Sequence, residues 1–196
     1  ENNGTIFIEV PDATTMIKKL RYDQIFHQHY HYFSLSSLKN LASRAGLKLV
    51  DHDLNKKFWG GSLMVALKKT QKKNNKILQN KTINSLIKNN YKKFKNKYKK
   101  IKIKINNSKN LIGYGAGQMT PTFAYHLNSK FKELDFILDD DKSKNLRFYP
   151  EIKPKILYSE NFKPKKNYTY LITALDGVSA IKKKLKINKL NKIISI

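Results

Sequence analysis

The sequence predicts an α/β protein built from two regions and a long helical connection. Short apolar segments of strand length alternate with amphipathic segments of helix length, which is typical of sheets covered by helices. A glycine-rich turn at 113–117 stands between a predicted strand and a predicted helix, as in Rossmann-like folds. Between the two regions, residues 69–107 are rich in lysine and asparagine and space their apolar residues as a helix does.

The N-terminal region reads as strand, helix, strand, strand. Residues 5–10 are apolar and end at Pro11, which predicts a strand, whereas 12–33 lack a period and predict an irregular segment. Ser34 is a good helix N-cap, and the helix that follows should end at Gly46. The remaining predicted elements here are a strand at 47–52, a polar turn at 53–58 and a strand at 61–68.

The C-terminal region alternates strand and helix from Asn110 onward, which favours a small parallel Rossmann-like sheet. One or two long amphipathic helices should precede it. The predicted elements are a strand at 111–113, a helix at 118–130, strands at 134–138 and 168–174, a helix at 178–185 and a last strand at 192–196. The predicted division is therefore 1–68, a helical linker at 69–107, and 108–196.

Composition narrows the class of protein. The net charge is +26, yet only Arg21, Arg44 and Arg147 among the 40 basic residues are arginine, the side chain that grips phosphate and guanine bidentately. A lysine-rich solvated surface is therefore favoured over a specific nucleic-acid partner. The chain has no cysteine, which fits the cytoplasm, and no apolar run reaches the roughly 20 residues that span a membrane.

A histidine cluster is the strongest candidate for chemistry. His27, His29 and His31 alternate within an aromatic segment, 21–34, and in an extended chain they would point the same way. Three interpretations stay open: a metal site, which lacks a neighbouring carboxylate or cysteine, a structural role in a buried loop, and general acid–base catalysis. We expect no metal here.

Three segments resemble, in the same order, the signatures of the S-adenosylmethionine-dependent sugar C-methyltransferases. They are the histidine segment 21–34, the stretch Trp59-Gly-Gly-Ser-Leu-Met-Val65, and the turn Gly113-Tyr-Gly-Ala-Gly117. The resemblance implies the C-terminal portion of such an enzyme, with 1–68 supplying the last strands of a class I methyltransferase sheet. The methyl-donor loop, and a zinc-binding domain found in the family, would then lie upstream of Glu1, so this chain is expected not to methylate by itself.

The resemblance also implies an acceptor and a base. The acceptor would be a nucleotide-linked keto-deoxy sugar, deprotonated next to its ketone before methyl transfer to carbon. His29 matches the position associated with the base and His27 the first histidine, whereas the family's glutamate between them is Gln28 here. Tyr30 and Tyr32 could donate hydrogen bonds to the developing enolate.

Two glycine-containing turns are further candidates for substrate binding. Gly61 and Ser62 form either a tight turn or a close backbone approach to the substrate. The second turn could receive S-adenosylmethionine, NAD, the acceptor's diphosphate or no ligand, with a carboxylate on the next strand facing a ribose. Its predicted binding residues are Gly113, Tyr114, Gly115, Gly117 and Asp139.

Two other functions compete with the methyltransferase. The unit from 113 to 141 alone would serve a nucleotide- or NAD-binding protein. Because the replacement at Gln28 weakens the base, an inactive fragment that acts as a binding module also stays open.

Overall fold

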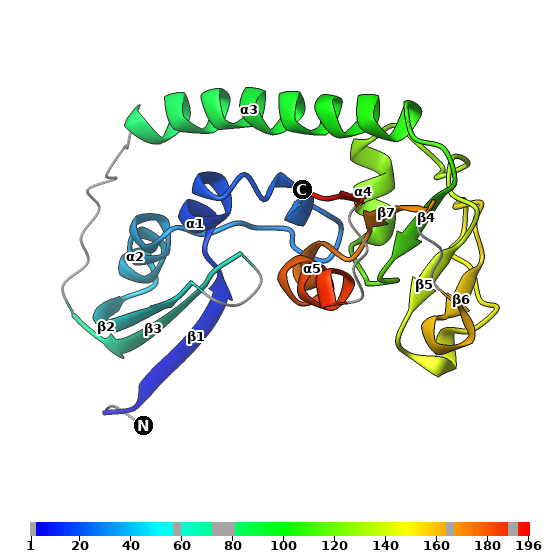
Figure 1. Ribbon diagram of the computed structural model, residues 1–196. Helices are drawn as coiled ribbons and strands as arrows, with labels where there is room; N and C mark the ends of the chain where they lie inside the picture. The colour runs from blue at the N-terminus through cyan, green and yellow to red at the C-terminus, as the bar shows by residue number, and fades with distance from the viewer. Residues whose placement is uncertain (1–2, 57–59, 72–80, 164–166, 188–191) are drawn as a thin grey trace. The chain divides into compact units, whose positions relative to one another are not determined.

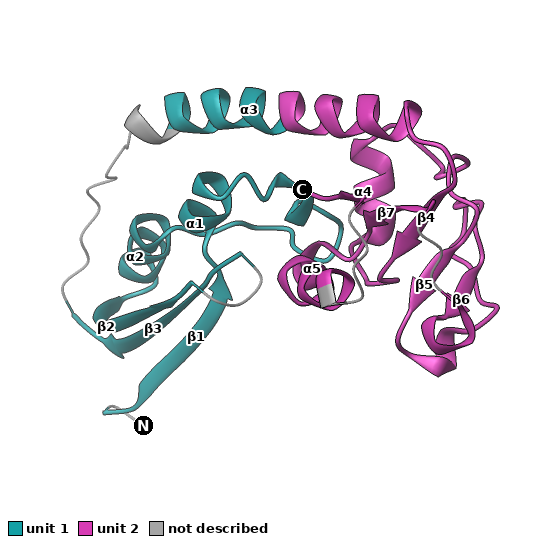
Figure 2. Cartoon of the chain, in the orientation of Figure 1, with its two compact units in different colours: residues 1–94 teal, residues 95–196 magenta. Residues whose placement is uncertain are grey.

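The computed structural model describes residues 3–56, 60–71, 81–163, 167–187 and 192–196 (Figure 1). The chain divides into two compact units, residues 1–94 and 95–196 (Figure 2). Unit 1 holds a small antiparallel sheet and unit 2 a five-stranded parallel sheet, which confirms the mixed α/β fold. The predicted domain boundaries at 68 and 107 stay a prediction.

The sheet of unit 1 has three strands, β1 (Thr5–Pro11), β2 (Leu47–Asn55) and β3 (Ser62–Lys69). β3 lies in the middle and is antiparallel to both neighbours, so that Ile8 and His52 flank Val65 on either side. The three predicted strands are confirmed. β2 continues through residues 53–55, where a polar turn was expected, because those residues pair with β3.

Two helices cover this sheet. α1 (Ala13–Lys18) lies in the segment predicted to be irregular, and Asp12 begins it by accepting a 2.8 Å hydrogen bond from the Thr15 amide. α2 (Leu35–Arg44) begins at Ser34, as predicted, with a capping box completed by Ser37. Its apolar side packs on β3, and this core comprises Leu38, Ala42, Leu63, Val65 and Leu67.

The sheet of unit 2 is parallel throughout, as predicted. Its strand order is β6-β5-β4-β7-β8, so the chain winds outward in both directions from β4. The strands are β4 (Leu111–Tyr114), β5 (Ile137–Asp139), β6 (Ile156–Tyr158), β7 (Thr169–Ile172) and β8 (Ile193–Ile194). Strand β6 was not predicted, because three residues behind Pro150 and Pro154 carry no alternating pattern.

Two short helices belong to unit 2, α4 (Thr120–His126) and α5 (Val178–Ile187). α4 ends four residues before the predicted boundary, since Asn128 adopts a left-handed backbone with φ 47° that no helix continues. Leu185 of α5 is buried against the sheet residues Ile112, Tyr170 and Ile172. Single turns of 3-10 helix occur at Tyr22–Gln24, Lys142–Lys144, Ser159–Asn161 and Leu175–Gly177.

In the part of the lysine-rich stretch that the structure describes, one helix occurs, α3 (Lys81–Asn106), and it contributes to both units, whereas residues 72–80 of the predicted linker lie outside the described residues. In unit 1, Phe94 packs on Tyr22 with ring centroids 5.4 Å apart. In unit 2, Tyr98 meets Phe123 of α4 edge to face at 5.7 Å. These buried aromatics make one stripe of an otherwise solvated helix, as its spacing predicted. Among the described residues, no helix combines the length and the apolar character needed to cross a bilayer.

Candidate active site

The histidine segment is fixed at its beginning by an ion pair. Arg21 donates from Nε to Asp23 Oδ1 at 3.0 Å and from its terminal nitrogen to Asp23 Oδ2 at 2.9 Å. The carboxylate is buried, with 1% of the residue exposed, so the paired guanidinium balances its charge. Tyr22 between them is also buried and donates its hydroxyl to the Ile87 carbonyl at 2.8 Å.

The far end of the segment is fixed by Tyr32. Its hydroxyl accepts a hydrogen bond from the Phe26 amide at 3.1 Å and lies 3.2 Å from the Gln24 carbonyl, to which it can donate. Residues 24–32 are thereby closed into a loop by one side chain. The sequence predicted that Tyr32 contacts substrate, and in the structure its hydroxyl holds the loop backbone.

His29 lies at the centre of this loop. It is half-buried, its ring is 5.6 Å from that of Phe26 and 6.1 Å from that of Tyr32, and its amide donates to the Phe26 carbonyl. His27, Gln28 and His31 are exposed, and Tyr30 is 90% exposed.

The three histidines do not share one face of an extended segment. The chain turns at residues 27–28, which corrects the expected geometry. Within the described part of the chain, no three His, Asp or Glu side chains gather so that they could hold a metal ion.

The turn before β3 is explained by packing. Gly61 has φ +131°, and a Cβ there would stand 2.6 Å from the Thr15 methyl carbon. Its carbonyl accepts the Asp12 amide at 2.9 Å, and Gly60 lies against the side chain of Gln24. Ser62 is buried as the first residue of β3. The close approach observed here is to α1, and a substrate role of Gly61 and Ser62 stays a prediction. Trp59 lies outside the described residues.

The glycine-rich turn of unit 2 is packed equally tightly. Gly115 has φ +95°, and a Cβ there would stand 2.5 Å from that of Ala174. Its carbonyl accepts the Thr173 hydroxyl at 2.7 Å. On β4, a Cβ at Gly113 would stand 2.8 Å from the Ile137 side chain. These glycines let the turns after β4 and β7 meet.

The polar groups of this turn are paired with one another. The Ala116 amide donates to Asp139 Oδ2 at 2.6 Å, and the Gly117 amide donates to the Thr120 hydroxyl at 3.1 Å. Lys144 donates to Asp139 Oδ1 at 3.1 Å. A ribose or diphosphate would have to displace these bonds. The nucleotide site predicted at Gly113, Tyr114, Gly115, Gly117 and Asp139 therefore stays a prediction that this closed geometry does not favour.

A polar cluster beside this turn was not foreseen. Asp140 accepts hydrogen bonds from Tyr114 at 2.7 Å, from Lys184 at 2.7 Å and from Ser159. The neighbouring Asp141 instead caps the turn that follows, by accepting a hydrogen bond from the Ser143 amide at 2.9 Å. Burial acts to raise the pKa of Asp140, but the hydrogen bonds from Lys184, Ser159 and Tyr114 outweigh it and lower that pKa. Burial, and then the bond to Asp140, raise the pKa of Tyr114.

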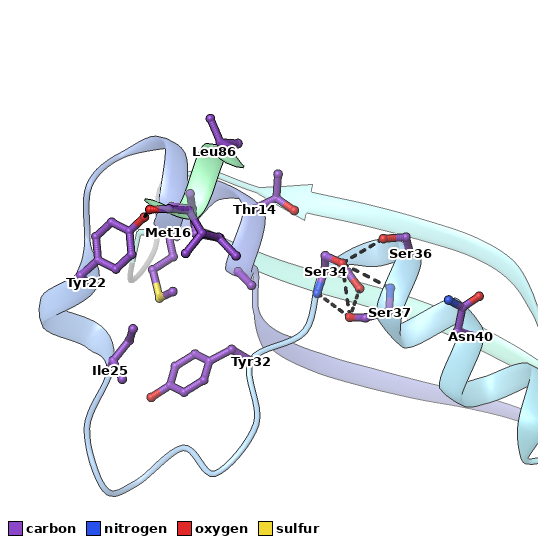
Figure 3. A pocket seen from close by; sticks show the side chains of 13 residues that line it. Thr14, Met16, Tyr22, Ile25, Tyr32, Ser34, Ser36, Ser37, Asn40 and Leu86 are labelled. Carbon is purple, nitrogen blue, oxygen red and sulfur yellow. Dashed lines mark hydrogen bonds between the residues drawn. The ribbon is translucent and has the colours of Figure 1, made fainter. Parts of the chain in front are cut away.

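A cavity of about 420 Å³ opens beside the histidine loop in unit 1 (Figure 3). Tyr22, Ile25 and Tyr32 line one side, and Ser36 and Asn40 of α2 line the other. No motif pointed to it, because its walls come from α1, the loop, α2 and α3. The remaining lining residues are Ala13, Thr14, Met16, Ile17, Ser34, Ser37, Leu86 and Ile87.

Comparison with known proteins agrees with this architecture. Residues 57–192 match the family model described as "C-methyltransferase C-terminal domain". That is most of the chain, so the protein belongs to this C-methyltransferase family. A stretch of 64 residues is 42% identical to the C-methyltransferase NovU of Streptomyces niveus. It covers 32% of this chain and 15% of that relative, so the match spans a small part of the relative's length.

Proposed function

We propose that this chain is the C-terminal part of a C-methyltransferase that uses S-adenosylmethionine and acts on a nucleotide-linked keto-deoxy sugar. Membership of the C-methyltransferase family supports the reaction class. The observation that carries the assignment is His29, a half-buried imidazole on a loop closed by Tyr32. An imidazole held at the surface of a unit can meet a substrate and exchange protons with solvent.

The step assigned to the chain is deprotonation next to the ketone. An unprotonated ring nitrogen of His29 takes the proton from the carbon, and the C–H electron pair forms a C=C bond while the carbonyl electrons move to oxygen. The resulting enolate carbon is the nucleophile for methylation. We assign to Tyr30, which is 90% exposed, the hydrogen bond to the enolate oxygen, and His27 lies on the same loop.

The methyl donor supplies an electrophilic methyl group, and the glycine-rich turn of unit 2 does not offer it a fitting site. The glycine-rich turn has its Ala116 and Gly117 amides paired internally, and the Asp139 carboxylate that would face a ribose holds Ala116 and Lys144. We therefore propose that the donor binds outside the described residues, and that this chain binds the acceptor and supplies the base.

The exposed edge of unit 1 supports its assignment to a larger sheet. β1 carries exposed apolar side chains on both of its faces, Ile6 at 47% and Phe7 at 69%, although Thr5 and Glu9 share the face of Phe7. Strands that are apolar on both faces are typical of sheets covered on both sides. The class I methyltransferase sheet proposed from the sequence would provide such cover.

Proton exchange tests the proposed base without any methyl donor. The 196-residue chain is incubated in D₂O with a nucleoside-diphosphate-linked 4-keto-6-deoxyhexose, and deuterium at the carbons beside the ketone is measured by mass spectrometry. We expect exchange above the buffer background, and about 100-fold slower exchange in the variant His29→Asn, since general-base catalysis contributes on that order.

His31→Asn is the matched control, because His31 is two residues away on the same loop and exposed. It should retain the exchange rate of the unchanged chain. Equal exchange rates for His29→Asn and the unchanged chain would rule out His29 as the base. Exchange by the unchanged chain no faster than in buffer alone would rule out the proposed function.

A further inference from the structure

A second cavity, which lies within unit 2, has walls rich in lysine. Its volume is about 730 Å³, inside the range of about 300–1,000 Å³ that is usual for small-molecule sites. Lysines outnumber glutamates four to two among the residues that line it. A cavity that concentrates one sign of charge raises the local concentration of ligands of the opposite sign, so this cavity favours an anion.

Both glutamates of this cavity are already paired. Glu133 accepts a hydrogen bond from Lys102 Nζ at 3.0 Å and another from the Ser129 hydroxyl at 2.7 Å. Glu151 forms an ion pair with Lys130. Because each carboxylate is matched by an ammonium group, neither leaves an uncompensated negative charge that would repel an anionic ligand.

The other two lysines of the cavity are uncompensated. Lys132 and Lys153 are exposed, and their ammonium groups make no hydrogen bond or ion pair with the described residues. The Lys153 amide donates to the Lys130 carbonyl at 3.0 Å, which holds the two segments that carry these lysines side by side. Two free ammonium groups on adjacent segments suit a phosphate or diphosphate, whose charge is spread over several oxygens.

The cavity also has an apolar part. Phe148 lines it, is 68% exposed, and contacts no other ring among the described residues. Ile152 is buried beside it in the same lining. An exposed aromatic face of this kind offers a platform on which a planar base can stack. A phosphate alone would leave this ring unused, and an apolar ligand would leave Lys132 and Lys153 uncompensated.

This cavity lies at the opposite end of the sheet from the glycine-rich turn. Residues 128–133 and 152–153 precede β5 and β6, so they lie at the amino ends of these parallel strands. The turn at 113–117 follows β4 and lies at the carboxyl ends. A ligand in the cavity therefore requires none of the amides that this turn uses internally, and it requires no residue of the histidine loop, which belongs to unit 1.

We propose that this cavity binds a nucleoside diphosphate, with the base on Phe148 and the diphosphate between Lys132 and Lys153. It is a ligand site separate from the proposed base His29, and the inference does not depend on the proposed function. The joint presence of an exposed ring and two uncompensated ammonium groups in one cavity carries it.

Amide shifts locate the ligand. The ¹⁵N-labelled 196-residue chain is titrated with ADP, adenosine and pyrophosphate at about 0.3 M salt, which screens diffuse attraction to surface lysines. We expect the largest shifts at Phe148 and Lys153, and binding of ADP at least about fivefold tighter than that of adenosine or pyrophosphate, since ADP alone uses both the ring and the lysines. Larger shifts at Gly113 and Gly115, or equal shifts along the lysines of α3, would overturn the proposal.

Variants separate the ring from the charges. Phe148→Ala should weaken ADP at least about fivefold and leave pyrophosphate binding unchanged, whereas Lys153→Gln should weaken both. The matched controls are Tyr125→Ala, at an exposed ring of unit 2 outside the cavity, and Lys100→Gln, at an exposed lysine of α3 outside it. Unchanged ADP binding by Phe148→Ala and Lys153→Gln, or equal losses in Lys153→Gln and Lys100→Gln, would overturn the proposal.

A nucleoside diphosphate can be free or can carry a sugar, and ADP-glucose distinguishes the two. Equal affinities for ADP and ADP-glucose, with shifts at Phe148 and Lys153 in both titrations, would support a site that takes a sugar-linked nucleotide. Tighter binding of ADP would support a site for the free nucleotide, whose terminal phosphate carries more charge. The deuterium exchange assigned to His29 is a separate measurement, so either result can fail without the other.

Discussion

Tyr32 shows how one hydroxyl can organise the loop that carries the proposed base. Phe26 and Gln24 lie six and eight residues before it, and its hydroxyl meets the amide of the first and the carbonyl of the second. The Arg21–Asp23 ion pair fixes the same loop at its start. These contacts hold the loop backbone on both sides of His29, which reduces the ordering needed when a substrate binds.

Removing this hydroxyl should loosen the loop. In Tyr32→Phe the Phe26 amide loses its acceptor, and we expect faster hydrogen exchange at that amide and a stability loss of about 1 kcal/mol. NMR-detected exchange and urea unfolding measure the two effects. Tyr125→Phe, at a 78% exposed tyrosine, should change neither. Unaltered exchange at Phe26 in Tyr32→Phe would show that the loop closes by other contacts.

The sequence located this loop but not its geometry. The composition around His29 and the order of the three motifs indicated the segment and the family. The turn at residues 27–28, the position of Tyr32 and the contact of Gly61 with Thr15 depend on tertiary packing, which no local pattern encodes.

At the scale of elements, the sequence patterns predicted the long helices and most strands but missed the short α1 and β6. α2, α3 and β3 were found because apolar spacing and the Ser34 cap agreed. α1 has six residues, and its two threonines gave no helical signal. Asp12, which precedes it, is a residue type that commonly caps a helix N-terminus, and in the structure it is the N-cap of α1. The glycine-rich turn was placed correctly between strand and helix, but its closure on Asp139 joins residues 23 apart and could not be inferred.

Asp140 ties three elements of unit 2 together, and its contribution should depend on pH. It accepts hydrogen bonds from Tyr114 of β4, from Ser159 of the 3-10 turn after β6, and from Lys184 of α5. Because its pKa is lower in the folded chain, the ionised carboxylate stabilises the fold above its unfolded pKa of about 3.9, and this stability is lost as the pH falls through the lower folded value.

Asp140→Asn should therefore destabilise the chain by about 1 kcal/mol at pH 7, as expected of a partly exposed cluster. The difference from the unchanged chain should shrink steadily between about pH 5 and pH 2. Urea unfolding across this range measures it, with Asp135→Asn at an exposed position before β5 as the control. A difference that stays constant with pH would show that the Asp140 charge contributes nothing.

At the scale of the whole molecule, charge is the dominant property. The 40 basic residues exceed the 14 acidic ones, and most of α3 outside its aromatic stripe is exposed lysine and asparagine. Such a surface attracts any polyanion, but it has few of the planar guanidinium groups that read base edges. The cavity beside the histidine loop differs from this background, because none of its described lining residues is charged.

Duplex DNA should consequently bind this chain without sequence preference. Counterion release predicts that the logarithm of the affinity falls linearly with the logarithm of salt, by a slope of about −0.9 per phosphate contacted. Fluorescence anisotropy with AT-rich and GC-rich duplexes of equal length measures both properties, and inorganic polyphosphate should compete with either duplex. A preference of tenfold or more for one duplex, persisting at high salt, would require base-specific contacts and contradict the assignment of the lysines to a solvated surface.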